Sequence, residues 1–259
     1  TSLNDNIDIE HPLQSRSVVS FQRFMQENFP DADFIIGASM YKIYPHTTEP
    51  PTPTARDGKS FYYDAINGSM QIKATSIESY IKSRLVIGVE IVPFPKLLKN
   101  FCVDLGGISG ALTTQPDREV FGKIAAPICY ESIYGDFITG FVRNGAQAIF
   151  VITNDGWWGD TFGYKQHFSY SRLRAIENRR SIARSANTGI SGFINQRGDV
   201  MQELGWWKRG TLTAAINLNS ELTVYARYGD YIGRLCSYIL IISLLYCVAY
   251  VYKKKSNLN

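Results

Sequence analysis

The stretch "IAAPICYES", residues 124–132, decides how this chain is interpreted. An apolar run ends at a single cysteine, Cys129, and the residues from Ser132 to Asn144 have the pattern of a helix. In this order of strand, cysteine and helix, the thiol lies at a turn where backbone N–H groups favour negative charge. We expect this setting to lower the pKa of the thiol and to supply donors for an oxyanion. A lone cysteine after an apolar run is also a common core side chain, so the rest of the chain must decide.

Strands and helices alternate on both sides of Cys129, which predicts a mixed α/β fold around a sizeable core. The chain has 259 residues, 45% of them hydrophobic and 19% charged, as in ordinary globular proteins. The patterns predict the following elements: a helix over 15–28, a strand over 33–39, a loop over 44–59, a hairpin over 60–74 that turns at Asn67-Gly68, a strand over 120–131, a strand over 146–155, a helix over 168–184, a hairpin over 189–204 and a last strand over 210–218.

Charge and cysteine spacing argue against two classes of partner. The net charge is only +4, from 27 Lys and Arg against 23 Asp and Glu, and no basic stripe alternates with aromatic residues, so we expect no nucleic-acid partner. The four cysteines form no CxxC pair and no zinc-ligand spacing with histidine, so their spacing indicates no zinc site. They are Cys102, Cys129, Cys236 and Cys247.

A second place where chemistry could occur is "SYIKSRLVIGVEIVPFP", residues 79–95. Lys82 stands before an apolar run that we expect to be a strand, and Glu90 follows it eight residues later. An ammonium group in a pocket can stabilise a developing oxyanion, and a neighbouring carboxylate can orient it. The alternative is an ordinary charged pair that flanks a strand.

A third place is "ITNDGWWGDT", residues 152–161, where a strand runs into a polar loop with two large aromatic side chains. Such a loop suits the wall of a binding site, with Asn154, Trp157 and Trp158 as its candidate residues. The alternative is that Asn154 and Asp155 cap the next element while the two tryptophans fill the core.

No histidine is marked by the sequence as a partner for Cys129. The three candidates lie in a polar N-terminal segment, a proline-rich loop and the start of a helix; they are His11, His46 and His167. A buried carboxylate whose pKa is raised toward neutrality could act as the base instead.

The C-terminal end has the composition of a membrane span. Residues 235–252 contain no charge, proline or glycine, and 18 helical residues would extend about 27 Å, close to the thickness of a bilayer core. Arg234 precedes this run and Lys253 to Lys255 follow it, which favours a cytoplasmic C-terminus. A buried helix of a soluble domain is the alternative.

Taken in order, these segments resemble the carbon-nitrogen hydrolase (nitrilase) superfamily and, within it, the apolipoprotein N-acyltransferases. "YIKSRLVIGVE" resembles the lysine motif Y-x-K-x-x-L-V-P-F-G-E, "PICYE" the cysteine motif and "NDGWWG" the loop N-D-x-W-[FW]-G. The segment from Gln166 to Gly198 resembles the pattern Q-H-x(4)-R-x-R-A-x-E through R-x-x-N-x-G. The resemblance runs from about Phe34 to the end of the chain.

The resemblance implies a nitrilase-like αββα sandwich over residues 1–228, incomplete at its N-terminus, a transmembrane helix over 229–252 and a basic cytoplasmic tail over 253–259. It implies an acyltransferase of the bacterial inner membrane that spans the membrane several times, with its catalytic domain in the periplasm. A phospholipid would be the acyl donor, and the diacylglyceryl cysteine of an apolipoprotein would be the acceptor. The resemblance implies no metal and no cofactor.

The resemblance also implies roles for single residues. Cys129 is the nucleophile, Lys82 and the backbone N–H of Tyr130 stabilise the oxyanion, and Glu90 and Glu131 orient Lys82 and the site. Asn154, Trp157 and Trp158 belong to the substrate-binding loop, and Trp157 lies near the acyl chain.

The sequence departs from the family in two respects. The glutamate of the family's Glu-Lys-Cys triad is expected upstream in a P-E-[TG]-A-like motif, which we do not find, so we expect this chain to be the C-terminal part of a longer enzyme and to be inactive alone. Ile87-Gly88-Val89 also replaces Pro-Phe-Gly in the lysine motif. Two alternatives remain: a membrane-tethered amidase, and an inactive truncated interaction domain.

Overall fold

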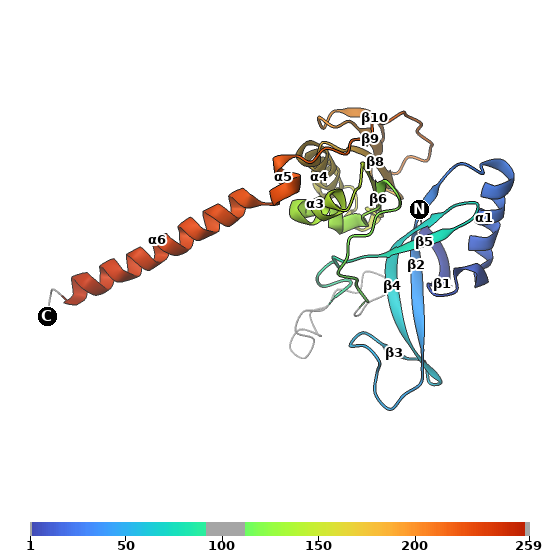
Figure 1. Cartoon of the computed structure of the whole chain (residues 1–259), viewed down its shortest axis with the longest axis horizontal. Coiled ribbons are helices and arrows are strands. Elements are labelled where there is room, and N and C mark those ends of the chain that lie inside the picture. Colours follow the sequence, from blue (N-terminus) through green and yellow to red (C-terminus); the bar gives the residue numbers. More distant parts are fainter. Residues whose placement is uncertain (1, 92–111, 257–259) are drawn as a thin grey trace.

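The computed structural model describes residues 2–91 and 112–256, and two five-stranded sheets form the centre of the fold (Figure 1). The first sheet has the order β1-β2-β4-β3, and β5 also pairs with β4. Its strands are β1 (Ser2–Asp8), β2 (Phe34–Pro45), β3 (Arg56–Asp57), β4 (Phe61–Ile72) and β5 (Ile77–Ile81). β1 runs parallel to β2, and the remaining pairs are antiparallel.

The second sheet has the order β10-β9-β8-β7-β6. The strands β6, β7 and β8 are parallel, and β9 and β10 add an antiparallel hairpin. Its strands are β6 (Ile124–Ala125), β7 (Ala148–Thr153), β8 (Ser181–Ala186), β9 (Ser191–Ile194) and β10 (Val200–Leu204).

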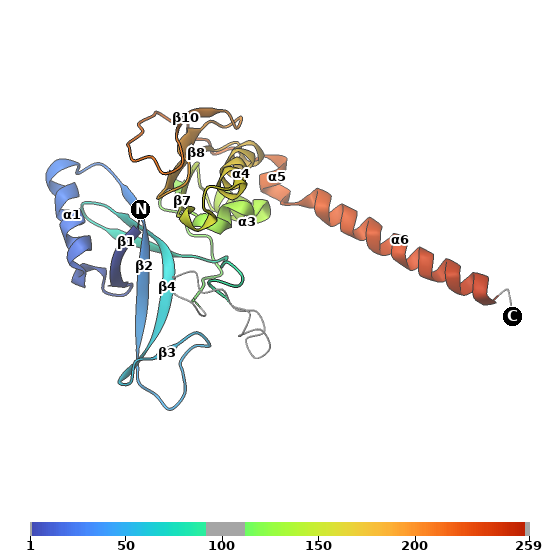
Figure 2. The same cartoon turned by 180° about the vertical axis from the view of Figure 1, so that it is seen from behind.

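Helices cover the outer faces of both sheets, so the layers follow the order helix, sheet, sheet, helix (Figures 1 and 2). The helix α1 (Arg16–Asn28) lies outside the first sheet, and α3 (Gly135–Arg143) and α4 (Phe162–Asn178) lie outside the second. Short helices join these elements: η1 (Pro12–Gln14), η3 (Cys129–Ile133), η4 (Gly156–Trp158) and α5 (Val224–Tyr228). This is the αββα arrangement that the family resemblance implies, and it agrees with the mixed α/β fold that the sequence pattern predicts.

Successive side chains of β2 point to opposite faces of the first sheet, which explains why both faces are apolar. Ile36, Ala38 and Met40 pack with Val18 of α1, whereas Ile35 contacts the core that includes the second sheet. Neighbouring strand residues point to opposite faces, so one strand serves both layers. The two sheets also share a hydrogen bond, since the Ser69 Oγ donates to the backbone oxygen of Ala126 at 3.1 Å, close before Cys129.

Gly68 corrects the predicted hairpin over 60–74. β4 continues through Asn67 and Gly68, which pair with Ser39 and Ala38 of β2. A Cβ atom on Gly68 would lie 2.2 Å from the backbone oxygen of Tyr80, so the glycine permits a close approach of β5 and makes no turn.

Several other predicted boundaries move. The helix predicted over 168–184 is α4, which ends at Asn178, and residues 181–184 belong to β8. Residues 210–218 form no strand, and the strand predicted over 120–131 shortens to β6. The helix over 15–28, the strand over 146–155 and the hairpin over 189–204 are confirmed.

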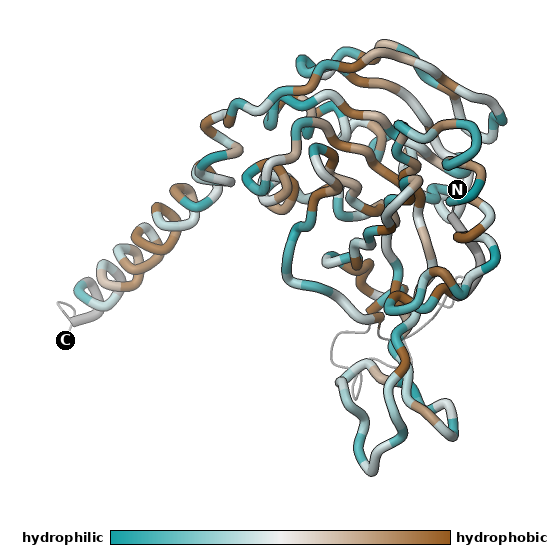
Figure 3. Tube along the Cα trace, turned by 45° about the vertical axis from the view of Figure 1, so that its right-hand side comes forward, coloured by the Kyte–Doolittle hydropathy of each residue, from teal (hydrophilic) through white to brown (hydrophobic). Residues whose placement is uncertain are grey.

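The helix α6 (Tyr231–Ser256) extends away from the sheets and is apolar along most of its length (Figure 3). Its segment from Tyr231 to Tyr250 has a mean hydropathy of 2.0, and none of it is buried against the rest of the described chain. By length and composition this helix can cross a membrane. A core helix of a soluble domain would instead be buried, so the structure does not favour that alternative.

Candidate active site

Cys129 is the first residue of η3 and follows the parallel strand β6 and the residues Ala126 to Ile128. Its φ of 50° lies in the left-handed region, which is uncommon for a side chain other than glycine. Such strain is found preferentially at functional sites, where the surroundings hold one residue in a fixed orientation. The residue is partly exposed and its thiol forms no disulfide.

Burial raises the pKa of the Cys129 thiol, contrary to the lowering that the helix start predicts. The positive charge of Lys82, a hydrogen bond with Thr153 and the charge of Arg184 act in the opposite direction. The thiol therefore needs a base to become a nucleophile, and Lys82 lies close enough for its ammonium group to favour the thiolate.

Lys82 follows β5 directly and is 1% exposed. Its Nζ atom donates to both carboxylate oxygens of Glu90, at 2.8 and 2.7 Å. Glu90 also accepts from the Asn67 Nδ2 at 2.8 Å and from the Val86 backbone N–H at 2.7 Å. Four hydrogen bonds hold the carboxylate, and the carboxylate in turn fixes the position of the ammonium group.

The strand predicted between Lys82 and Glu90 is wrong. Gly88 has a φ of 87°, and the backbone oxygen of Val86 accepts from the N–H groups of residues 89, 90 and 91. This turn folds Glu90 back onto Lys82, whereas a strand of eight residues would have separated the two charges by more than 20 Å.

Glu131 connects the lysine segment to the cysteine segment from a fully buried position. Its Oε1 accepts from the Tyr80 hydroxyl at 2.7 Å and from the backbone N–H groups of Ser83 and Arg84, and its Oε2 accepts from the Ile128 N–H at 2.8 Å. Burial raises the pKa of Glu131, and these hydrogen bonds oppose the shift. One side chain thus sets the position of Lys82 relative to Cys129.

The loop after β7 carries the other predicted residues. Asn154 is exposed and its Oδ1 accepts from the Gly156 N–H and the Thr188 hydroxyl, both at 3.2 Å. The rings of Trp157 and Trp158 stack with their centroids 4.3 Å apart, and Trp157 is 41% exposed. The described structure thus leaves Trp157 available at the surface of this loop.

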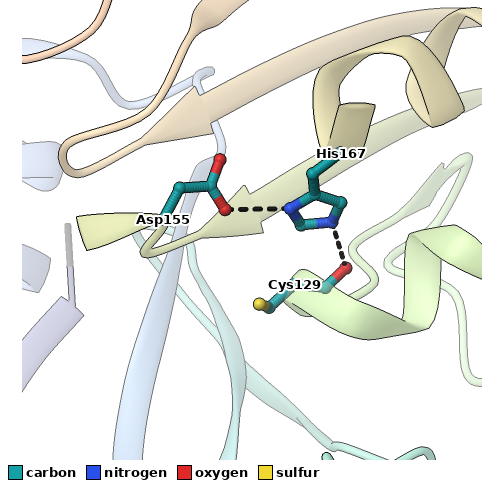
Figure 4. A group of neighbouring side chains, drawn as sticks. All are labelled: Cys129, Asp155 and His167. Carbon is teal, nitrogen blue, oxygen red and sulfur yellow. Dashed lines mark hydrogen bonds and ion pairs between the residues drawn. The ribbon is translucent and has the colours of Figure 1, made fainter. Parts of the chain in front are cut away.

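Asp155 and His167 form a buried group that the sequence does not reveal (Figure 4). The Asp155 Oδ1 is 2.8 Å from the His167 Nδ1, and its Oδ2 accepts from Arg184 at 2.8 Å. The His167 Nε2 lies 3.1 Å from the backbone oxygen of Cys129, and Figure 4 shows the sulfur directed away from the ring. His167 therefore contacts the main chain of Cys129, and the arrangement is not a Cys-His dyad.

Among the described residues, the ligating atoms of Cys129, Asp155 and His167 lie within 4.8 Å of one another, as in a potential metal site. The Asp155 carboxylate is already engaged, because it accepts from Thr153, His167 and Arg184. A cation would also have to displace the guanidinium group of Arg184. These contacts favour a hydrogen-bonded network over a metal centre.

The buried network predicts a loss of stability in acid. Burial lowers the pKa of His167, and burial raises the pKa of Asp155 less than the His167 hydrogen bond and the Arg184 charge lower it. Both groups bind protons more readily in the unfolded chain. The contribution of His167 is present above the ordinary histidine pKa of about 6.5 and is lost as the pH falls through its folded-state pKa, whereas the contribution of Asp155 is lost only below the ordinary aspartate pKa of about 3.9. We expect thermal unfolding temperatures to decrease between pH 7 and pH 5. A flat profile over this range, or an equal decrease in His167→Gln, would contradict the assignment to His167.

Comparisons with known proteins agree with this geometry. The carbon-nitrogen hydrolase family profile matches residues 54–223. The chain is 36% identical over 207 residues to an apolipoprotein N-acyltransferase of Chlorobaculum tepidum, covering 74% of this chain and 38% of that protein. It is 37% identical over 163 residues to an apolipoprotein N-acyltransferase of Agrobacterium fabrum, covering 60% of this chain and 30% of that protein.

Among solved structures, the carbon-nitrogen hydrolase of Helicobacter pylori G27 superimposes with a TM-score of 0.50 at 13% identity, covering 78% of this chain and 66% of that chain. This likeness concerns the fold. The chain spans 38% and 30% of the lengths of these two curated relatives.

Proposed function

Because the chain belongs to the carbon-nitrogen hydrolase family, we propose that it is the catalytic part of an acyltransferase that N-acylates bacterial apolipoproteins. The observation that carries the proposal is the connection of Cys129 to the Lys82–Glu90 pair through the single buried carboxylate of Glu131. The relatives named apolipoprotein N-acyltransferase support the choice of reaction.

In the first half-reaction the Cys129 sulfur attacks the carbonyl carbon of the sn-1 ester of a phospholipid. A C–S bond forms, and the ester C–O bond breaks as the lysophospholipid leaves with a proton. The base that removes the thiol proton is the upstream glutamate that the family resemblance implies. Lys82 and the N–H of Tyr130 stabilise the negative charge on the carbonyl oxygen during the attack.

In the second half-reaction the α-amine of a diacylglyceryl cysteine attacks the thioester. The C–S bond breaks, an amide forms, and the proton released by the amine passes to the base. The thiol is restored and the enzyme can react again, which predicts ping-pong kinetics. Trp157 and Trp158 provide an apolar wall for the acyl chain, and Asn154 holds the loop that carries them.

The apolar helix α6 supports a membrane location for this reaction. We propose that α6 crosses the bacterial inner membrane, that the two sheets lie on its periplasmic side and that the lysines after Tyr252 lie in the cytoplasm. This arrangement brings both lipid substrates within reach of the site.

The test is to incubate the purified whole protein in detergent with a defined phosphatidylethanolamine and to record intact masses. We expect one acyl chain to be added, and we expect it to move to a diacylglyceryl lipopeptide when that acceptor is present. Hydrolysis of small amides without any transfer to the lipopeptide would support the amidase alternative and reject the proposal. Absence of both reactions would support the interaction-domain alternative.

A further inference from the structure

His167 contacts the peptide unit that joins the nucleophile to the proposed oxyanion donor. The carbonyl of Cys129 and the N–H of Tyr130 belong to one planar peptide group, which is trans like all peptide bonds of the described residues. In such a group the carbonyl and the N–H point in opposite directions. Any contact that fixes the carbonyl therefore also fixes the direction of the Tyr130 N–H.

Two side chains hold that carbonyl. The Ser132 Oγ donates to the Cys129 oxygen at 2.8 Å, and the His167 Nε2 lies 3.1 Å from the same oxygen. Ser132 and His167 also contact each other at 3.0 Å, and both are buried. Both contacts are made to the Cys129 carbonyl oxygen, and Figure 4 shows this oxygen and the sulfur directed to different sides.

The ring of His167 is itself fixed by the Asp155 carboxylate, which contacts its other nitrogen. The Asp155 carboxylate can only accept, so the Nδ1 atom at 2.8 Å carries a proton and donates to it. With Nδ1 protonated, Nε2 carries a proton only in the charged ring, which is the form that donates to the Cys129 carbonyl. In the neutral ring the donor to this carbonyl is Ser132, and His167 supports the carbonyl only through Ser132, whose Oγ lies 3.0 Å from Nε2.

Asp155 is fixed in turn by groups that leave no space for movement. Its oxygens accept from the Thr153 hydroxyl at 2.9 Å and from Arg184 at 2.8 Å. A Cβ atom on Gly189 would lie 2.3 Å from its Oδ2, so the loop after β8 closes tightly over the carboxylate. Rigid support of this kind is what a site needs to hold a catalytic group within about 0.5 Å of its working position.

We propose that His167, supported by Asp155 and Arg184, is a positioning residue that aims the Tyr130 N–H at the oxyanion formed when Cys129 attacks. This inference rests on the proposed function, since it takes Cys129 as the nucleophile. His167 acts through the peptide group and does not remove the thiol proton. It therefore affects only reactions that generate an oxyanion.

This difference gives a sharp experiment. Acylation by a phospholipid passes through an oxyanion, whereas alkylation of a thiol by iodoacetamide does not. Both rates would be measured on Cys129 of the whole protein, by intact mass for acylation and by peptide mass mapping for alkylation, because Cys236 and Cys247 are exposed and also react. The variants are His167→Ala, His167→Gln and Ser132→Ala, each checked by thermal unfolding.

For His167→Ala we expect acylation to slow by about 10- to 100-fold, since displacement of one oxyanion donor by about 1 Å has effects of this size. The rate of Cys129 alkylation in this variant should stay within about twofold of the rate in the unmodified protein. His167→Gln carries an amide N–H that can reach the same carbonyl, so it should recover most of the acylation rate. Ser132→Ala, which removes the second contact, should slow acylation and leave alkylation unchanged, and it provides the test if His167→Ala does not fold.

Three results would overturn the inference. Unchanged acylation in both His167→Ala and Ser132→Ala would show that the peptide group needs no such support. If folded His167→Ala loses alkylation as well as acylation, the ring acts on the thiol itself. If His167→Gln acylates Cys129 as slowly as His167→Ala, a hydrogen bond to the carbonyl is not what the ring provides. Failure of the unmodified protein to acylate Cys129 would instead reject the proposed function, so the two failures are distinguishable.

Discussion

Replacing Cys129 with alanine is expected to abolish the acyl adduct completely while leaving the fold in place. The adduct requires a sulfur nucleophile, and the described residues within reach of the Lys82 charge offer no second thiol. The φ of 50° at this position already applies to a side chain with a Cβ atom, so alanine adds no new backbone strain. We expect the unfolding free energy to change by about 1 kcal/mol or less.

Intact mass spectrometry with a phospholipid donor, followed by peptide mapping, measures this effect. Cys236→Ala is the matched control, because Cys236 is an exposed cysteine on α6 and its loss should leave the adduct unchanged. Cys129→Ser should also fail to accumulate an adduct, since a hydroxyl is far less readily ionised than a thiol. An adduct of the same mass on Cys129→Ala, located at another residue, would remove Cys129 from the nucleophile role.

The order of the catalytic segments could be predicted from the sequence because each one follows an apolar run. Cys129 follows β6 and Asn154 follows β7, and these two strands are neighbours in the second sheet. Lys82 follows β5 of the first sheet, and it is the packing of the two sheets that brings it to the same site. The mixed α/β class follows from the same alternation of strands and helices, whereas the order of the layers is implied by the family resemblance. Patterns of period two and 3.6 are local, and they carry this information without knowledge of contacts.

The predictions that the structure contradicts concern segments whose conformation depends on contacts with distant residues. Gly68 was interpreted as a turn because Asn-Gly is a strong local turn signal, but the approach of the Tyr80 carbonyl decides its role. The apolar run after Lys82 predicts a strand, but the Glu90 carboxylate is held by the Asn67 Nδ2, 23 residues away, and by Lys82, and these contacts require a turn. In both cases a tertiary contact overrides the local preference.

The Asp155–His167–Arg184 network was missed for a related reason. Asp155 lies at the end of β7, His167 in α4 and Arg184 in β8, so no spacing in the sequence connects them. His167 was considered only as a partner for the sulfur, whereas its contact is the backbone oxygen of Cys129. Every residue has a backbone oxygen, so the residue type of the acceptor does not indicate such a hydrogen bond.

Replacing Lys82 with methionine is the second change with a large expected effect. Lys82 is a buried cation whose charge acts on the Cys129 thiol more strongly than that of Arg184. Its removal should slow acylation of Cys129 by about 10²- to 10³-fold, as for the loss of an oxyanion donor. Its charge also lowers the pKa of the Cys129 thiol. Without it that pKa rises further, so the pH at which iodoacetamide alkylation reaches half its maximal rate should move upward.

The same change also affects the fold, and the two effects can be separated. Methionine leaves the largely buried Glu90 carboxylate with only Asn67 and Val86 as partners. We expect this loss to lower the free energy of unfolding by up to about 3 kcal/mol. The double variant Lys82→Met/Glu90→Gln has no unpaired charge and should regain most of that stability. Its acylation rate should remain as low as in the single variant, because neither methionine nor glutamine supplies an ammonium group. If the double variant acylates Cys129 at the rate of the unmodified protein, Lys82 serves only to neutralise Glu90, and the stabilisation of the oxyanion must come from other groups.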